Sequence, residues 1–195
     1  MDYSGNECRN RPGRGADLTI VVEYMKNNLI FVALSPNNVS HCAIFTSLMK
    51  SYIAEMNEHS HRPLPEMYWQ KWIDSIIRIL GDQDRHLELC RLDNEWIGFL
   101  YGKADHEDHK GFIKPGYGYI MEFYVRPEYR RKGIGSKMLE RMEALFQQDG
   151  VQNVYLTADP VTGKPFWEAM AYKNSGEISP DNRLEIYEKT LSGSN

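Results

Sequence analysis

A short basic stretch with two glycines, at positions 130–136, could bind a phosphate group. Arg130, Arg131 and Lys132 precede Gly133 and Gly135, and an amphipathic helix pattern starts directly afterwards. Glycine allows backbone angles and close approaches that a side chain would block. The first N–H groups of a helix lack intrahelical partners and carry a partial positive charge, which suits an anion. The stretch therefore predicts a site for a phosphate or pyrophosphate group, and so a phosphate-bearing cofactor.

Two common phosphate-binding motifs do not fit the chain. A dinucleotide-binding fingerprint needs a third glycine three residues after Gly135, where the sequence has Met138. A Walker pattern fails at Gly163 and Lys164, because Pro165 follows them and the upstream glycine is missing. The elements around the stretch must therefore identify the cofactor.

A strand and a helix are predicted to hold the basic turn in place. Aromatic and branched residues over 119–125 predict a strand, which ends before Pro127 because proline has no N–H to donate to a sheet. From position 134 onward apolar residues recur every three or four positions, at Ile134, Met138, Leu139, Met142, Leu145 and Phe146. This spacing predicts a helix with one buried face. The turn thus lies at a helix N-terminus.

The remaining patterns predict an alternation of strands and helices on both sides of this unit. Strands are expected at 29–34, 86–92, 96–101, 151–157 and 184–190, and helices at 39–59, 66–80 and 164–170. Residues 105–118 are polar and rich in glycine, which indicates a loop, and such loops often carry substrate contacts. This order of strands and helices predicts a fold of the α/β (α+β) class, in which the basic turn follows the central strand.

Composition narrows the classes of function. The length of 195 residues fits one domain. The net charge of the chain is -4 and the charged residues are spread along the sequence, which argues against a dedicated nucleic-acid binder. Its three cysteines, Cys8, Cys42 and Cys90, lack metal-ligand spacing and cannot form a closed disulfide framework. No apolar run is long enough to cross a bilayer. We expect residues 1–24 to be a disordered or non-native leader, and 25–195 to form a single domain in the cytoplasm, away from membranes.

The motif Val125-x-Pro127-x-x-Arg130-x-x-Gly133-x-Gly135 resembles the cofactor-binding motif of the GNAT superfamily of acyl-CoA N-acyltransferases. The order of elements over 29–191 matches that fold as well. The resemblance implies a mixed, mostly antiparallel sheet of six to seven strands flanked by helices. It also implies a splayed central strand pair, opened by a bulge near 123–125.

The resemblance further implies a site for acetyl-CoA. In the family the basic turn holds the pyrophosphate, while freed backbone groups of the strand pair with the pantetheine arm. The residues that this assigns to cofactor binding are Phe123, Tyr124, Val125, Arg130, Arg131, Lys132, Gly133, Ile134, Gly135, Ser136 and Trp167. Trp167 belongs to Pro165–Tyr172, which resembles the late family segment Phe-Tyr-x-x-x-Gly-Phe, with Trp167 in place of the tyrosine.

Transfer of an acetyl group to an amine requires a proton acceptor, because an alkyl ammonium has a pKa of about 10.4. Glu122 is the best candidate, since strand alternation places its side chain opposite Met121 and Phe123. Binding of a cationic substrate, or pairing with a cation on a neighbouring strand, remains an equal alternative for this carboxylate. The resemblance also implies that backbone N–H groups near Val125 stabilise the oxyanion.

The sequence offers several routes for protonating the leaving thiolate. An indole at position 167 cannot supply a usable proton, so Tyr172 or Tyr155 could serve, or the thiolate could leave unaided because a thiol pKa is only about 8.5. A Trp167 that only forms the wall beside the pantetheine arm is the simpler interpretation. We take Glu122 and Tyr172 as the candidate catalytic residues.

The acceptor is expected to be a primary amine of a small molecule or peptide, contacted by Glu55, His59 and Glu122. No metal is expected, and a homodimer is left open. Two functions follow. The first is an acetyl-CoA-dependent N-acetyltransferase that uses direct attack in a ternary complex, and the second is a non-catalytic acyl-CoA-binding module of the same fold.

Overall fold

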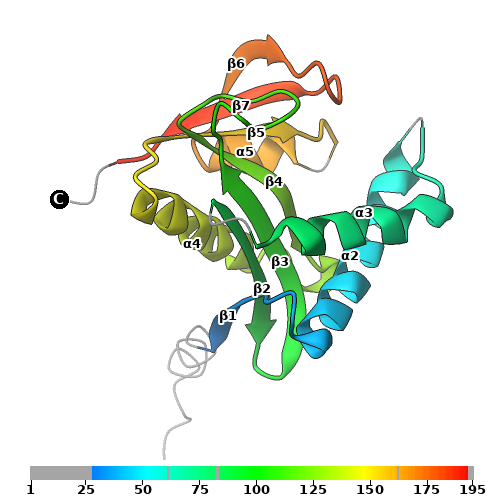
Figure 1. The fold of residues 1–195 in the computed structure, drawn as a ribbon. Helices are drawn as coiled ribbons and strands as arrows, with labels where there is room; N and C mark the ends of the chain where they lie inside the picture. Colours follow the sequence, from blue (N-terminus) through cyan, green and yellow to red (C-terminus); the bar gives the residue numbers. More distant parts are fainter. Residues whose placement is uncertain (1–27, 61, 82–83, 162, 193–195) are drawn as a thin grey trace, which may run out of the picture.

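The computed structural model describes residues 28–60, 62–81, 84–161 and 163–192 (Figure 1). The predicted leader, residues 1–24, lies outside this part of the chain. None of the described helices combines the length and the apolar composition that crossing a bilayer requires.

Seven strands form one sheet in the order β1-β2-β3-β4-β5-β7-β6. Their bounds are β1 Leu29–Ala33, β2 Arg85–Leu92, β3 Glu95–Ala104, β4 Tyr117–Val125, β5 Asn153–Ala158, β6 Lys173–Ile178 and β7 Glu185–Thr190. All neighbours are antiparallel except β4 and β5, which are parallel. The expected mixed, mostly antiparallel sheet is therefore confirmed. The edge strand β6 was not predicted, because all six of its residues are exposed and so carry no alternation of apolar side chains.

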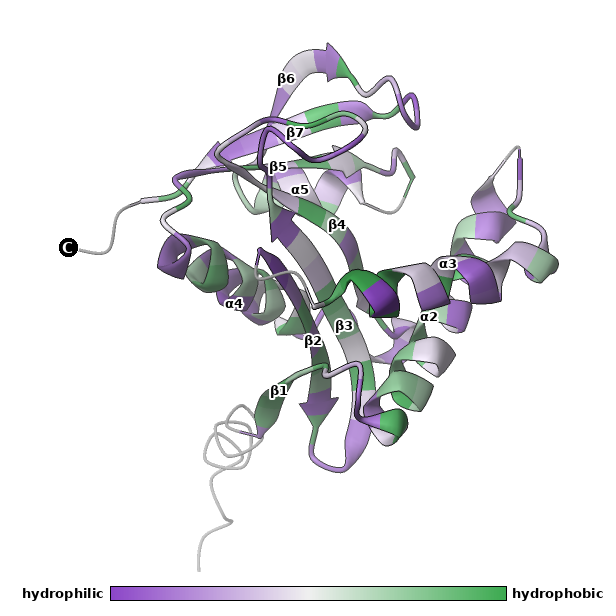
Figure 2. Cartoon of the chain, in the orientation of Figure 1, coloured by the Kyte–Doolittle hydropathy of each residue, from purple (hydrophilic) through white to green (hydrophobic). Residues whose placement is uncertain are grey.

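Helices cover both faces of this sheet. The helices α2 (Val39–His59) and α3 (Glu66–Ile79) lie on one face, and α4 (Ile134–Gln148) and α5 (Lys164–Ala169) lie on the other (Figure 1). A single 3-10 turn, η1 (Pro127–Tyr129), precedes the basic stretch. Each face has its own apolar core, and the residues predicted for the buried face of α4 are all buried. Hydrophobic and hydrophilic residues accordingly alternate around α4 in Figure 2.

The two central strands separate partway along their length. β4 pairs with β5 only from Tyr117 to Ile120, opposite Asn153 to Leu156. Beyond Ile120, β4 stays paired with β3 as far as Val125, while β5 continues against β7. The expected splayed pair is confirmed, and it leaves one backbone edge of β4 open over its last residues.

The bulge in β4 lies earlier than predicted. Tyr101 of β3 faces Glu122, but its neighbour Gly102 faces Ile120, so Met121 is the extra residue. The expectation of a bulge at 123–125 is therefore wrong. A Cβ on Gly102 would come within 2.9 Å of the Tyr119 carbonyl oxygen, so glycine permits the close approach beside the bulge.

This bulge changes which way the neighbours of Glu122 point. Met121 packs against the α2 and α3 core, whereas Phe123 packs against the α4 and α5 core. The alternation expected from the sequence would put Met121 and Phe123 on the same face of the sheet, and this expectation is wrong. An extra residue in a strand inverts the alternation beyond it, which is why spacing along the sequence could not give the direction of this carboxylate.

Candidate active site

Two adjoining cavities occupy the opening between the splayed strands. Their volumes are about 460 Å³ and 410 Å³. Both are lined by Tyr52, Glu55, Phe123, Gly163 and Trp167. The larger cavity extends toward the basic turn, and the smaller extends toward helices α2 and α3. The shared lining makes them two compartments of one cleft.

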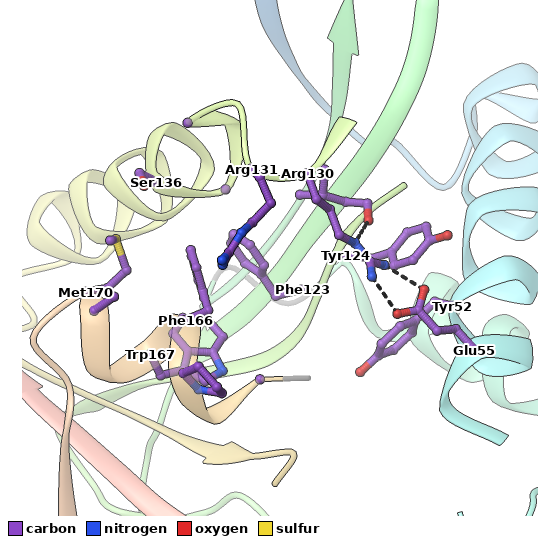
Figure 3. A pocket seen from close by; sticks show the side chains of 16 residues that line it. Tyr52, Glu55, Phe123, Tyr124, Arg130, Arg131, Ser136, Phe166, Trp167 and Met170 are labelled. Atoms are coloured by element: carbon purple, nitrogen blue, oxygen red, sulfur yellow. Dashed lines mark hydrogen bonds and ion pairs between the residues drawn. The ribbon is translucent and has the colours of Figure 1, made fainter. Parts of the chain in front are cut away.

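The basic turn forms one end of the larger cavity (Figure 3). Gly133 is the N-cap of α4 and has a φ of 76°, a left-handed conformation that favours glycine. A Cβ on Gly135 would lie 3.1 Å from Cε2 of Phe166, so glycine is also needed for close packing against α5. Gly133, Gly135 and Ser136 all line the cavity. The first N–H groups of α4 thus lie where an anion could accept their hydrogen bonds.

The basic residues of the turn do not act together as expected. Arg131 lines the larger cavity, as do Phe123 and Phe166 (Figure 3). Lys132 lies outside both cavities and donates to the backbone oxygen of Glu128 at 2.8 Å. The side chain of Ile134 is buried in the core, so only its backbone can serve a ligand.

Arg130 is paired with Glu55, a residue assigned to the acceptor. Its two terminal nitrogens donate to the two carboxylate oxygens of Glu55 at 2.7 Å and 2.6 Å (Figure 3). Its Nε donates to the backbone oxygen of Val125 at 2.7 Å. The hydrogen bonds that the Arg130 guanidinium donates to Glu55 raise its pKa. Both side chains still line the cleft, but each neutralises the other.

The open edge of β4 presents backbone groups to the cleft. The N–H of Arg126 donates to Ile97 on β3 at 2.8 Å. Because N–H directions alternate along a strand, the N–H of Val125 points to the opposite edge, away from β3. Phe123, Tyr124 and Val125 all line the larger cavity. The backbone position expected to stabilise an oxyanion therefore lies in the cleft.

Glu122 lines the smaller cavity, and the hydroxyl of Tyr52 donates a hydrogen bond to its carboxylate. Burial raises the pKa of Glu122 to about 7, although the Tyr52 hydrogen bond acts in the opposite direction. Burial also raises the pKa of Tyr52, and the nearby Glu122 charge adds to that effect. A carboxyl group with a pKa near neutrality can accept a proton in the physiological range.

The smaller cavity combines aromatic walls with acidic groups. Its aromatic lining consists of Tyr52, Trp72, Tyr119, Phe123 and Trp167, and its acidic lining of Glu55, Glu122 and Asp159. The predicted acceptor residue His59 also lines it. The sequence argument missed Tyr52, although it lies three residues before Glu55 and so shares its helix face. It also missed Thr157 and Asn182, which reach the cavity from segments after β4 and carry no local signal.

The tyrosines considered as proton donors lie away from the cleft. Tyr172 is 2% exposed and its hydroxyl donates to Oε1 of Glu143 at 3.1 Å. The Tyr155 hydroxyl donates to Asp105. Neither tyrosine lines either cavity. The structure therefore does not bring the predicted Tyr172 to the reaction site.

Trp167 forms the wall between the two compartments. Its ring makes edge contacts with Phe123, Phe166 and Tyr172, with centroids 5.4, 4.9 and 5.5 Å away. It is 7% exposed and lines both cavities. Among the described residues, no group of three His, Cys, Asp or Glu side chains is arranged to hold a metal ion.

Comparison with known proteins identifies the family. Residues 43–169 match the model of the acetyltransferase (GNAT) family. The PaiA N-acetyltransferase of Thermoplasma acidophilum, solved in complex with coenzyme A, is 18% identical with a TM-score of 0.60, covering 84% of this chain and 99% of that one. A GNAT-family acetyltransferase of Staphylococcus aureus is 12% identical with a TM-score of 0.64, over the same shares. At these identities the structures show a common fold.

A curated relative matches over a shorter stretch. The Arabidopsis thaliana protein named Probable N-acetyltransferase HLS1 is 33% identical over 58 residues, which cover 28% of this chain and 14% of that protein. The match of the family model covers more than half of the chain, and the seven-stranded sheet with its splayed centre agrees with it. The chain belongs to the acetyltransferase (GNAT) family.

Proposed function

We propose that this chain is an N-acetyltransferase that transfers an acetyl group from acetyl-CoA to a primary amine by direct attack in a ternary complex. The observation that carries the proposal is the position of Glu122. Its carboxyl group, with a pKa of about 7, lies in a compartment that adjoins the cavity at the N-terminus of α4. An anion site and a proton acceptor thus share one cleft, as a two-substrate transfer requires.

Acetyl-CoA is assigned to the larger compartment. The N–H groups at the start of α4, together with Arg131, suit a pyrophosphate. The open edge of β4 offers N–H and C=O groups to the amides of the pantetheine arm, in the manner of an added strand. The bound coenzyme A in the Thermoplasma acidophilum neighbour supports this assignment.

The chemistry follows from the groups in the cleft. Glu122 takes a proton from the ammonium, directly or through water, and the neutral amine attacks the acetyl carbonyl carbon. The new C–N bond places negative charge on the carbonyl oxygen, which the N–H of Val125 stabilises. The nitrogen, which became positively charged on attack, loses its second proton to solvent as the C–S bond breaks, and the neutral amide and the thiolate are released. Because a thiol has a pKa of about 8.5, the thiolate can leave and take its proton from solvent, without a tyrosine at position 167.

The smaller compartment favours a compact amine. Aromatic faces attract a cation and also cover an apolar carbon skeleton, and Glu122 and Asp159 add negative charge. A volume of about 410 Å³ is in the range of small-molecule sites. We therefore favour, as the acceptor substrate, a small and partly apolar molecule with a primary ammonium group over a long peptide.

The test is release of thiol from acetyl-CoA with a panel of amines: polyamines, aminoglycosides, amino acids, arylalkylamines and Lys-containing peptides. We expect turnover with a small amine, and a loss of about a hundredfold or more in kcat for Glu122→Gln with acetyl-CoA affinity retained. Glu140→Gln, an exposed change on α4, is the control. Binding of acetyl-CoA without turnover of any amine would favour the non-catalytic module, and an unchanged rate in Glu122→Gln would remove this residue from the base role.

A further inference from the structure

We infer that Glu55 and Arg130 form a brace that positions the end of β4 for acetyl transfer, rather than binding the acceptor and the donor phosphate. This inference rests on the proposed function, because it assigns a positioning role in that reaction. The pair joins helix α2 to the strand end that carries the backbone N–H of Val125.

Each of the three guanidinium nitrogens of Arg130 donates a hydrogen bond within the protein. Its two terminal nitrogens form a bidentate pair with Glu55, its Nε bonds to the Val125 oxygen, and its guanidinium lies over the ring of Tyr124, with 5.7 Å to the centroid. A planar guanidinium fixes the direction of each of these contacts, which a single ammonium group could not do. Figure 3 shows Arg130 turned toward Tyr124 and Glu55, on the other side from Arg131. Arg131 is therefore the side chain available to a phosphate.

The strand end needs support from another element. Beyond Ile120 the described part of β4 pairs with β3 alone, because β5 has turned away. The Val125 oxygen points to the open edge, and there it meets Arg130. The side chain of Arg130 thus gives the Val125 oxygen the hydrogen-bond donor that an adjacent strand would otherwise have provided.

Residues on one face of α2 are linked to both Glu122 and Val125 of β4. Tyr52 and Glu55 are three residues apart and share a helix face. Tyr52 bonds to Glu122, the proposed base, and Glu55 holds Val125 through Arg130. The two links fix the base and the oxyanion site relative to one helix. A shift of the strand end would misplace the N–H of Val125 and slow the chemical step more than it weakens binding.

The kinetic test compares Glu55→Gln and Arg130→Lys with wild type. We expect each to lower kcat by about tenfold to a hundredfold, with the Kd for acetyl-CoA changed by less than about threefold. The double variant should be no worse than the worse single variant, because both changes break one link. Glu58→Gln, an exposed change one turn further along α2 and outside both cavities, should leave kcat unchanged.

Arg131→Ala should affect acetyl-CoA binding rather than kcat, the opposite of the pattern expected for Glu55→Gln and Arg130→Lys. Losing a charged phosphate contact should weaken acetyl-CoA binding by about tenfold or more while kcat at saturation is largely kept. The brace is refuted if Arg130→Lys behaves in this way, since Arg130 would then be a phosphate ligand. It is also refuted if Glu55→Gln retains full kcat.

A second measurement does not depend on turnover. Amide hydrogen exchange over residues 121–126 should become faster in Glu55→Gln and Arg130→Lys, but not in Glu58→Gln, because the strand end loses its support. Unchanged exchange would refute the brace. If wild type binds acetyl-CoA and acetylates no amine, the proposed function fails, while the exchange measurement still decides whether the brace exists.

Discussion

At the scale of single residues, the chemistry of the cleft depends on the surroundings of Glu122. Burial disfavours the charged carboxylate, and the hydroxyl of Tyr52 partly restores it. The balance leaves the pKa near neutrality, where a base is deprotonated in part of the population and still able to bind a proton. The sequence identified the carboxylate, but its partner comes from a helix 70 positions earlier.

Replacing Tyr52 by Phe should raise the pKa of Glu122 above about 7, because the hydrogen bond that lowers this pKa is lost. Since the base acts only when deprotonated, the rising limb of kcat/KM against pH should move to higher pH, and the rate at pH 6.5 should fall. Measuring kcat/KM from pH 5.5 to 9 checks this. Tyr68→Phe, an exposed change on α3, controls for removal of a hydroxyl. A limb that stays in place or moves to lower pH would contradict the assignment.

At the scale of elements, two short segments shape the donor compartment. The start of α4 depends on the left-handed Gly133 and on the close contact between Gly135 and Phe166. Helix α5 contributes Phe166 and Trp167, which pack on Phe123 of β4. Helix α5 therefore packs on the part of β4 that the opening of the sheet leaves without a strand on one side.

Gly135→Asp should weaken acetyl-CoA binding by about a hundredfold or more. The new side chain meets Phe166 and adds a negative charge beside the proposed pyrophosphate site, where charge repulsion is strong. Isothermal titration with acetyl-CoA measures the effect. Gly81→Asp adds the same charge at an exposed position with open space, and should bind normally. Retained affinity in Gly135→Asp would exclude the start of α4 as the phosphate site.

Trp167→Phe should keep kcat within about fivefold, because we assign the indole to the wall of the cleft and not to proton transfer. A smaller ring leaves some space beside Phe123 and Phe166, so a modest loss of stability and a higher KM for acetyl-CoA are expected. Steady-state kinetics together with thermal unfolding separate the two effects. Trp96→Phe, outside both cavities, is the matched change. A hundredfold fall in kcat would instead indicate a direct role for the indole.

At the scale of the whole molecule, the cleft requires an opening in an otherwise continuous sheet. One apolar core lies under α2 and α3 and another under α4 and α5, and the cleft lies between residues of both. Glu122 is half-buried in this cleft, and partial removal of its carboxylate from water costs folding free energy that other contacts must offset.

Glu122→Gln should make the fold more stable at pH 8 but change it little at pH 4.5. The folded state holds a proton on Glu122 up to a pKa of about 7, above the ordinary carboxyl value, so the native protein binds more protons than the unfolded chain between these values. The contribution of this group to stability is therefore present at low pH and is lost as the pH rises through about 7. The difference at pH 8 should reach up to roughly 3 kcal/mol.

Urea unfolding at pH 4.5 and pH 8 measures this difference. Glu140→Gln, on the exposed face of α4, should show no comparable dependence on pH. A Glu122→Gln protein that is less stable than wild type at pH 8 would show that the charged carboxylate does not lower the stability of the folded state.

Local patterns determined much of this protein. The spacing of apolar residues gave α2, α3 and α4, and the turn with Gly133 and Gly135 gave the start of α4, because helix faces and left-handed turns depend on residues close in sequence. Tertiary structure decided the rest. Arg130 and Glu55 are 75 positions apart, and they pair because the end of β4 packs against α2, where Tyr124 meets Tyr52. The bulge at Met121 reversed the alternation that the sequence implied, and the exposed strand β6 had no apolar pattern to reveal it. Sequence spacing describes neighbours along the chain, whereas pairing across the fold depends on register and packing, which only the folded chain sets.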